Sequence, residues 1–163
     1  MSYALIRSAT DEDGPAIGKL IASVFADYEN CHFVDEEYPE LEHPSSYYAA
    51  MGGQIWVAEQ DGVIVGSLAV AESLTPGLFE LHKVYVAKEA RGQGLAWSMF
   101  NLATDLVDKR EGKAIRLWSD TRFLEGHAFY EKIGFQKVPV ERFLGDVSDS
   151  WEFGYRLDAK DAG

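Results

Sequence analysis

The sequence predicts a single mixed α/β domain in which helices flank one central sheet. Its 163 residues favour one domain with one core, and 47% of them are hydrophobic, as in ordinary globular proteins. Strand-like alternation and helix-like spacing follow one another in the order β-α-β-β-β-α-β-α-β-β. Since no repeat, linker or low-complexity segment interrupts this order, we expect one domain over residues 1–163, with its core at about residues 3–158.

The first part of the chain predicts a strand, a helix and a loop. Tyr3 to Ser8 alternates as a strand does. Thr10 is a good N-cap, and acidic residues follow it, so we expect a helix that runs to about Tyr28. Residues 29–45 are polar, aromatic and proline-containing, which indicates a loop, and a short helix is expected near Ser45 to Met51.

Three strands are predicted next, the first two of them as a hairpin. Gln54 to Glu59 and Val63 to Ala71 are joined at Asp61-Gly62, which is a strong hairpin signal. Thr75-Pro76-Gly77 predicts a turn, and Phe79 to Val86 predicts the next strand.

The second half predicts two helices and three strands. A helix is expected from Gln93 to Arg110, with apolar residues on one face, and Gly112 can end it. The remaining elements are a strand, a helix that stops at Gly134, and two final strands: Ala114 to Ser119, Phe123 to Ile133, Phe135 to Phe143 and Trp151 to Leu157.

The segment Arg91-Gly92-Gln93-Gly94-Leu95-Ala96 lies between a predicted strand and a predicted helix. Glycines at such a turn let the backbone approach a ligand, because no Cβ stands in the way. The free N–H groups of the first helical turn and the positive end of the helix dipole then bind an anion, usually a phosphate. Arg91 adds a positive charge at the same point. The segment therefore predicts a phosphate-bearing ligand that is held mainly by the main chain.

The charge of the chain is strongly acidic and unevenly placed. A net charge of −12 argues against nucleic acid as a partner, because such binding needs a basic surface. Residues 11–50 hold ten acidic residues and one basic residue, Lys19. Two interpretations stay open, a solvated face that aids solubility and an acidic rim that attracts a cationic substrate.

Sequence features also bear on location and metals. The N-terminus lacks the pattern of a signal peptide, no apolar run approaches the length of a membrane span, and Cys31 is the single cysteine. We therefore expect a cytoplasmic protein without a membrane partner. None of His32, His43 and His127 stands at a metal-ligand spacing, so we expect no metal.

Two motifs carry a resemblance to a known family. Arg91-x-x-Gly94-x-Ala96 resembles the R/Q-x-x-G-x-G/A motif of the GNAT family of N-acetyltransferases, and Ala128-Phe129-Tyr130-Glu131-Lys132-Ile133-Gly134-Phe135 resembles the end of that family's last helix. They stand in the family's order and spacing, and the resemblance covers roughly residues 3–158. It implies a mostly antiparallel central sheet that is splayed between its fourth and fifth strands.

The resemblance implies acetyl-CoA as the ligand and an amine as the acceptor. In the family, the main chain of the turn binds the CoA pyrophosphate, and the strand before it binds the pantetheine arm. The corresponding residues here are Arg91, Gly92, Gln93, Gly94, Leu95 and Ala96 for the turn, and Val84, Tyr85 and Val86 for the strand.

The resemblance also implies two catalytic roles. Tyr130 corresponds to the tyrosine that stands near the CoA sulfur and serves as general acid, and a phenol remains protonated at pH 7. Glu80 lies where several members place a base that deprotonates the amine. His82 points to the same face, and water is a third alternative for this proton.

The sequence departs from the family pattern at Phe123, where many members carry an asparagine that touches CoA. A phenyl ring cannot make those hydrogen bonds. The acceptor is expected to be small and cationic; acylation of a protein lysine or N-terminus, or a non-catalytic acyl-CoA-binding role, are the alternatives. Exposed late strands often support dimers in relatives, so a homodimer is a further hypothesis.

Overall fold

The computed structural model describes residues 3–159 and contains one seven-stranded sheet with four α-helices. The strands are β1 (Leu5–Ser8), β2 (Gln54–Gln60), β3 (Val63–Glu72), β4 (Leu78–Val86), β5 (Ala114–Asp120), β6 (Gln136–Phe143) and β7 (Trp151–Asp158). The helices are α1 (Gly14–Phe25), α2 (Pro44–Ala50), α3 (Leu95–Lys109) and α4 (Leu124–Lys132). Short 3-10 helices are η1 (Asp11–Asp13), η2 (Asp35–Glu37), η3 (Pro39–Glu42) and η4 (Lys88–Ala90). None of the helices in the described part is long and apolar enough to cross a membrane.

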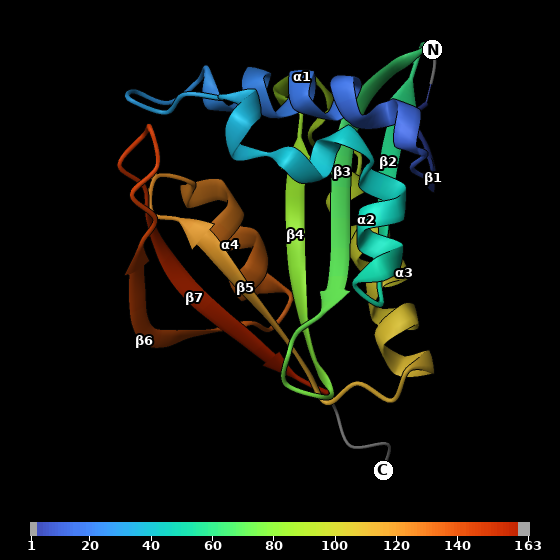
Figure 1. Ribbon diagram of the computed structural model, residues 1–163, viewed down its shortest axis with the longest axis vertical. Helices are drawn as coiled ribbons and strands as arrows, with labels where there is room; N and C mark the ends of the chain where they lie inside the picture. The colour runs from blue at the N-terminus through green and yellow to red at the C-terminus, as the bar shows by residue number, and fades with distance from the viewer. Residues whose placement is uncertain (1–2, 160–163) are drawn as a thin grey trace.

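The sheet has the order β1-β2-β3-β4-β5-β7-β6. All neighbouring strands are antiparallel except β4 and β5, which are parallel. These two pair only at Leu78–Ala114, Phe79–Ile115 and Glu80–Arg116, and they diverge beyond these residues. The predicted mixed α/β fold with a splay between the fourth and fifth strands is therefore confirmed, and Figure 1 shows the two halves of the sheet opening like a V.

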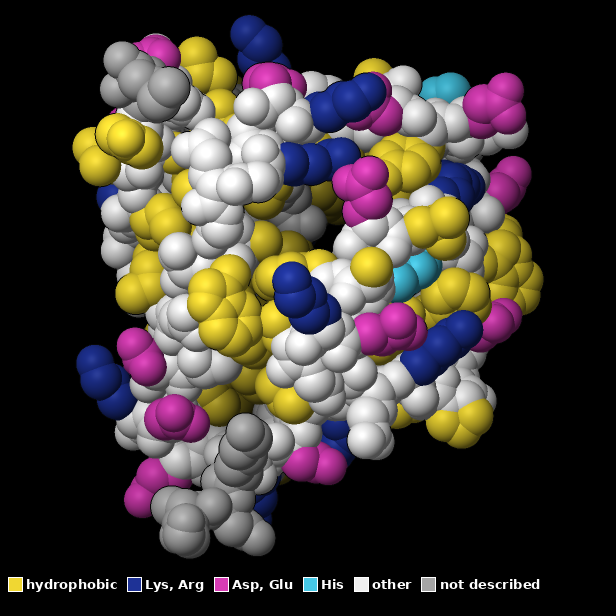
Figure 2. All heavy atoms as spheres, turned by 180° about the vertical axis from the view of Figure 1, so that it is seen from behind, with side chains coloured by type: hydrophobic (Ala, Val, Ile, Leu, Met, Phe, Trp, Pro, Cys, Tyr) yellow, Lys and Arg dark blue, Asp and Glu magenta, His cyan; other side chains and the backbone are white. Residues whose placement is uncertain are grey.

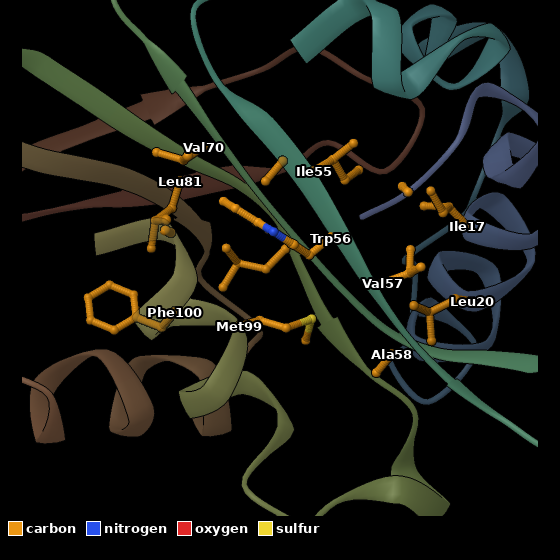
Figure 3. Packing of buried hydrophobic residues seen from close by; sticks show 14 of the residues in the cluster. Ile17, Leu20, Ile55, Trp56, Val57, Ala58, Val70, Leu81, Met99 and Phe100 are labelled. Carbon is orange, nitrogen blue, oxygen red and sulfur yellow. The ribbon is translucent and has the colours of Figure 1, made fainter. Parts of the chain in front are cut away.

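Helices cover both faces of the β2–β4 half of the sheet (Figure 1). Alternate residues of β2 point to opposite faces, so Val57 packs toward Ile17 of α1 while Trp56 lies on the side of Met99 of α3 (Figure 3). Val57, Ile17 and Met99 are fully buried. This two-sided core fixes the ends of α1 and α3, which border the opening of the V.

Helix boundaries differ slightly from those predicted. The first helix begins as the 3-10 helix η1, in which the Asp13 side chain accepts a hydrogen bond from the Thr10 N–H at 2.7 Å, and α1 proper ends at Phe25 rather than Tyr28. Helix α3 begins at Leu95 rather than Gln93, because Gly94 takes a left-handed conformation with φ 74°.

Candidate active site

The divergence of β4 from β5 opens two clefts that meet inside the V. A bulge in β4 lies beside the opening: the pairing with β3 shifts between Ser67 and Ala69, and Lys83 has a φ of 56°. The Ser67 hydroxyl donates a hydrogen bond of 2.6 Å to the Lys83 carbonyl, which fixes the bulge. A bulge leaves one residue outside the regular ladder, so the main chain next to Val84 is turned toward the opening.

The first cleft, here called the turn cleft, lies between the N-terminal end of α3 and helix α4 and has a volume of about 780 Å³. Seen from behind, the molecule is hollowed near its middle, with hydrophobic side chains beside the hollow (Figure 2). Nine of the ten residues predicted to bind the cofactor line this cleft: Val84, Tyr85, Val86, Arg91, Gly92, Gly94, Leu95, Ala96 and Tyr130. Gln93 is exposed and is not part of the lining.

The turn before α3 has the geometry of an anion-binding cradle. Gly92 and Gly94 have φ angles of 87° and 74°, and a Cβ added at either would meet nothing within 4 Å. No side-chain hydrogen bond caps α3 among the described residues. The first N–H groups of the helix are therefore available to a ligand, and the helix dipole favours a negative one.

The side chain of Arg91 does not point freely into the turn cleft. Its guanidinium donates to Glu125 of α4 at 2.7 Å and to the Val86 carbonyl at 3.3 Å. The positive charge expected at the turn is thus already paired across the mouth of the cleft. The main chain remains the principal anion-binding element of the turn.

The second cleft, here called the polar cleft, opens on the other side of the V and has a volume of about 600 Å³. It is bordered by β4, β5, the end of α1 and residues 142–152. The two clefts share five lining residues, which are Val84, Tyr85, Ser119, Phe123 and Tyr130. Ligands in the two clefts would therefore meet at this shared wall.

Tyr130 is fixed at the meeting point of the clefts. Its ring lies 5.9 Å from the rings of Phe135 and Tyr155, and the residue is only 6% exposed. None of the described residues makes a hydrogen bond with its hydroxyl, although both clefts reach the side chain. Burial raises the pKa of this phenol above its usual range, so the hydroxyl stays protonated and can donate to a ligand atom.

Glu80 is engaged in a network of its own and lines neither cleft among the described residues. Its carboxylate accepts hydrogen bonds from His82 Nε2 at 3.0 Å and from Arg116 Nε on β5. The hydrogen bond from His82, followed by the contact with Arg116, lowers the pKa of Glu80 to about 2. A carboxylate held in this way is a weak base, so these contacts weigh against Glu80 as the group that takes the amine proton, and that role stays a prediction.

His82 lines the polar cleft, but both of its ring nitrogens have partners. Glu80 is ionised and can only accept, so Nε2 carries the proton, and Nδ1 lies 3.2 Å from the hydroxyl of the buried Tyr48. The ring is thereby fixed at the wall of the cleft. It has no lone pair left for an incoming amine in this arrangement.

Replacing Glu80 by glutamine is expected to destabilise the fold at neutral pH. The pKa in the folded state, about 2, is below the ordinary value of 4.5 for this side chain, so the stabilisation is complete above about pH 4.5 and disappears as the pH falls toward 2. Because the carboxylate side chain is 20% exposed, we expect a loss of about 1 to 2 kcal/mol in the free energy of unfolding. Urea unfolding of both proteins between pH 7 and pH 3 measures it. A Glu80→Gln protein of unchanged stability whose kcat falls about 100-fold would instead favour the base role.

Phe123 makes aromatic contacts where many family members have an asparagine that touches CoA. It precedes α4 as its N-cap and makes no capping hydrogen bond. Its ring lies 4.9 Å from that of Tyr28 and 5.8 Å from that of Phe25 at the end of α1. The Phe123 ring therefore connects the start of α4 to the end of α1 at the wall that the two clefts share. The sequence alone did not indicate this contact.

Ser119 is a second residue that sequence reasoning missed. It lies near the end of β5, is 6% exposed, and lines both clefts beside Tyr130. No local motif marks it, because it becomes part of the site only when β5 diverges from β4.

The acidic stretch of residues 11–50 contributes little to either cleft. Of its ten acidic residues, Glu37 is the one that lines the polar cleft in the described structure. Others are held in ion pairs, such as Asp13 with Arg7 at 2.8 Å and Glu40 with Lys83 of β4 at 2.7 Å. The polar cleft nevertheless has more acidic than basic lining residues, with Glu37, Asp120, Asp146 and Glu152 against Lys83 and Arg142.

No group of three or more metal-ligating side chains is present within residues 3–159. The expectation that no metal takes part stays a prediction.

The fold and the two clefts define a mixed α/β protein in which two adjoining clefts meet beside an uncapped, glycine-containing turn before α3. A family model described as an acetyltransferase (GNAT) domain matches residues 51–137, just over half of the chain. The chain therefore belongs to the GNAT acetyltransferase family, as the motifs predicted, and it is an acetyl-CoA-dependent acyltransferase. The matched segment contains every lining residue of the turn cleft except Val24 and Tyr28, whereas Phe25, Cys31 and residues 142–152 of the polar cleft lie outside it.

Similar proteins agree with this assignment. The uncharacterized N-acetyltransferase YjgM of Escherichia coli K12 is 29% identical over 140 residues, which cover 82% of this chain and 83% of that protein. An acetyltransferase of the GNAT family from Staphylococcus aureus Mu50 has the same fold, with a TM-score of 0.82, 21% identity and coverage of 97% of this chain and 100% of that one. The protein yncA of Salmonella typhimurium, solved with its cofactor acetyl-CoA, has a TM-score of 0.71, 17% identity and coverage of 98% and 96%.

Proposed function

We propose that the protein transfers the acetyl group of acetyl-CoA to a small amine by direct attack in a ternary complex. The observation that carries this proposal is that two separate clefts meet at the phenol of Tyr130, whose hydroxyl has no hydrogen-bond partner among the described residues. Acetyl-CoA fits the turn cleft, with its pyrophosphate at Gly92 to Ala96 and its pantetheine arm along Val84 to Val86. The acceptor enters from the polar cleft, so both substrates are held at the same time.

The reaction joins the amine nitrogen to the acetyl carbon and breaks the bond from that carbon to sulfur. The main-chain N–H of Val84, beside the bulge, donates to the thioester oxygen as its negative charge develops. Tyr130 donates a hydrogen bond to the departing sulfur, and the proton that the attacking amine releases ends on this sulfur, so CoA leaves as its thiol. Because a buried phenol is a weaker acid than a thiol, the phenol acts by hydrogen bonding and any proton it gives is returned from the amine.

The amine must lose a proton before or during the attack. Glu80 and His82 are held by each other, by Arg116 and by Tyr48, so in this proposal water in the polar cleft takes the proton and the Glu80–His82 pair shapes the wall beside that water. Ser119 faces the same meeting point and can hydrogen-bond such a water. The carboxylates of the cleft favour an acceptor whose amino group is cationic in solution.

A free-thiol release assay tests this function. With acetyl-CoA and a panel of amines, polyamines, amino acids and aminoglycosides, we expect release that requires an amine and initial-rate lines that intersect, as a ternary complex demands. Parallel lines would indicate an acetylated enzyme intermediate and would contradict direct attack. We also expect kcat/KM for the acceptor to fall as salt is added, because screening weakens the attraction of the acidic cleft.

A further inference from the structure

Arg142 is a preorganised guanidinium on the wall of the polar cleft. It lies on β6 opposite Glu152 of β7, and its Nε donates to Glu152 Oε1 at 2.7 Å. Its Cζ lies 4.3 Å from the ring centroid of Trp118 on β5, so the side chain reaches back over β7 and the guanidinium lies over the indole. One edge of the guanidinium and one face are thus occupied.

The strand register explains why this arrangement forms. Trp118 stands opposite Gly154 of β7, and a Cβ at Gly154 would come within 3.2 Å of the Trp118 ring and 2.7 Å of Val138. Since Gly154 has no side chain, the indole can lie over the strand and present its face to Arg142. The ion pair with Glu152, whose side chain is 15% exposed, then fixes the direction of the guanidinium.

The Nη1 and Nη2 atoms of Arg142 have no hydrogen-bond partner among the described residues, although the side chain lines the polar cleft and is 47% exposed. An arginine whose Nε is already bound keeps a planar fork of two Nη donors, and this geometry matches the two oxygens of a carboxylate. The cation of Lys83, by contrast, is paired with Glu40 at 2.7 Å, and both of those side chains are mostly buried. Arg142 is therefore the lining cation of this cleft that is half-exposed and presents a free planar pair of Nη groups.

We propose that Arg142 binds a carboxylate of the acceptor, so that the acceptor is an amine that also carries a carboxylate, as amino acids do. This inference rests on the proposed function, and it names the substrate class of the polar cleft. The carboxylates that line the cleft are compatible with a bound carboxylate because each of them already accepts a hydrogen bond from the protein. The pairs are Glu37 with Val147 N–H at 2.9 Å, Asp120 with Arg122 N–H at 2.9 Å, Asp146 with Ser150 N–H at 2.7 Å, and Glu152 with Arg142 itself. The ammonium end of such an acceptor still enters a cleft of net negative charge.

The test compares amino acids with their primary amides in the thiol-release assay. The quantity measured is the ratio of kcat/KM for the acid to that for the amide, and differences in amine basicity cancel when this ratio is compared between proteins. We expect Arg142→Gln to lower the ratio about 10- to 100-fold, the range expected for loss of hydrogen bonds to a charged group. Arg142→Lys keeps a cation beside Glu152 but lacks the fork, so we expect a smaller fall in the same ratio.

Arg156 provides the matched control. It lies on β7, is 49% exposed, and its Nε donates to Asp158 at 2.9 Å, but it lines neither cleft. We expect Arg156→Gln to leave the ratio unchanged. Equal ratios in the wild type and both Arg142 variants would overturn the carboxylate subsite while leaving amine acetylation intact.

A binding measurement separates the carboxylate subsite at Arg142 from the proposed acetyl transfer. Calorimetric titration of each amino acid of the panel into the protein saturated with CoA should show at least one that binds, and Arg142→Gln should abolish that binding. Failure of every amine to release thiol would refute the proposed function. In that case, amino-acid binding that depends on Arg142 would still support the subsite, and binding that is absent or independent of Arg142 would overturn it.

Discussion

Replacing Tyr130 by phenylalanine is expected to lower kcat by about 100- to 1000-fold and to leave the affinity for acetyl-CoA almost unchanged. The phenyl ring keeps the contacts with Phe135 and Tyr155, so the shape of both clefts is preserved. Only the hydroxyl, which has no partner among the described residues, is removed from the junction of the clefts. Steady-state kinetics with an accepted amine, together with calorimetric binding of acetyl-CoA, measure the two quantities.

Tyr155 is a suitable control for this variant. It is 2% exposed and lies next to Tyr130, and burial also raises the pKa of its phenol, but it lines neither cleft. Tyr155→Phe should therefore change stability more than kcat. Full turnover by Tyr130→Phe would show that sulfur leaves without help from this phenol, and the role of Tyr130 as hydrogen-bond donor to the sulfur would fail.

The part of the site that could be predicted from sequence is the part formed by local chemistry. Two glycines between a strand and a helix predict an open turn with free N–H groups, and Gly92 and Gly94 both take the left-handed conformation there. Tyr130 is predicted from its place in a motif that spans the end of α4 and the turn after it. Both features lie in short segments of the chain, so their neighbours in sequence are also their neighbours in space.

The rest of the site depends on contacts between strands and helices that are distant in sequence. Glu80 was predicted as a base, but the register of β4 with β5 places Arg116 opposite it, and no local pattern reveals that pairing. Phe123 was recognised only as a missing hydrogen bond, whereas its contacts with α1 depend on how the two halves of the V approach each other. Arg142 was not singled out, because its stacking on Trp118 needs β7 to insert between β5 and β6.

Replacing Gly94 by valine is expected to weaken acetyl-CoA binding by about 100-fold. Gly94 has a φ of 74°, which a β-branched residue adopts only with strain, and its Cβ position faces the open turn cleft with nothing within 4 Å. Valine would place two methyl groups where the pyrophosphate approaches the N–H groups of α3. Loss of one or two hydrogen bonds to a charged phosphate accounts for a change of this size. Calorimetric titration with acetyl-CoA measures it.

Backbone strain alone would also reduce the amount of folded protein, so the experiment needs a glycine with the same strain outside the cleft. Gly62, in the turn between β2 and β3, has a φ of 77°, and a Cβ there also meets nothing within 4 Å. Gly62→Val should therefore lower the thermal midpoint about as much as Gly94→Val does, while the Kd for acetyl-CoA stays at the wild-type value. If both variants weakened binding equally, the effect at Gly94 would reflect general destabilisation and the turn would not be the phosphate cradle. If only Gly94→Val lost affinity, the space above that glycine would be the space that the ligand occupies.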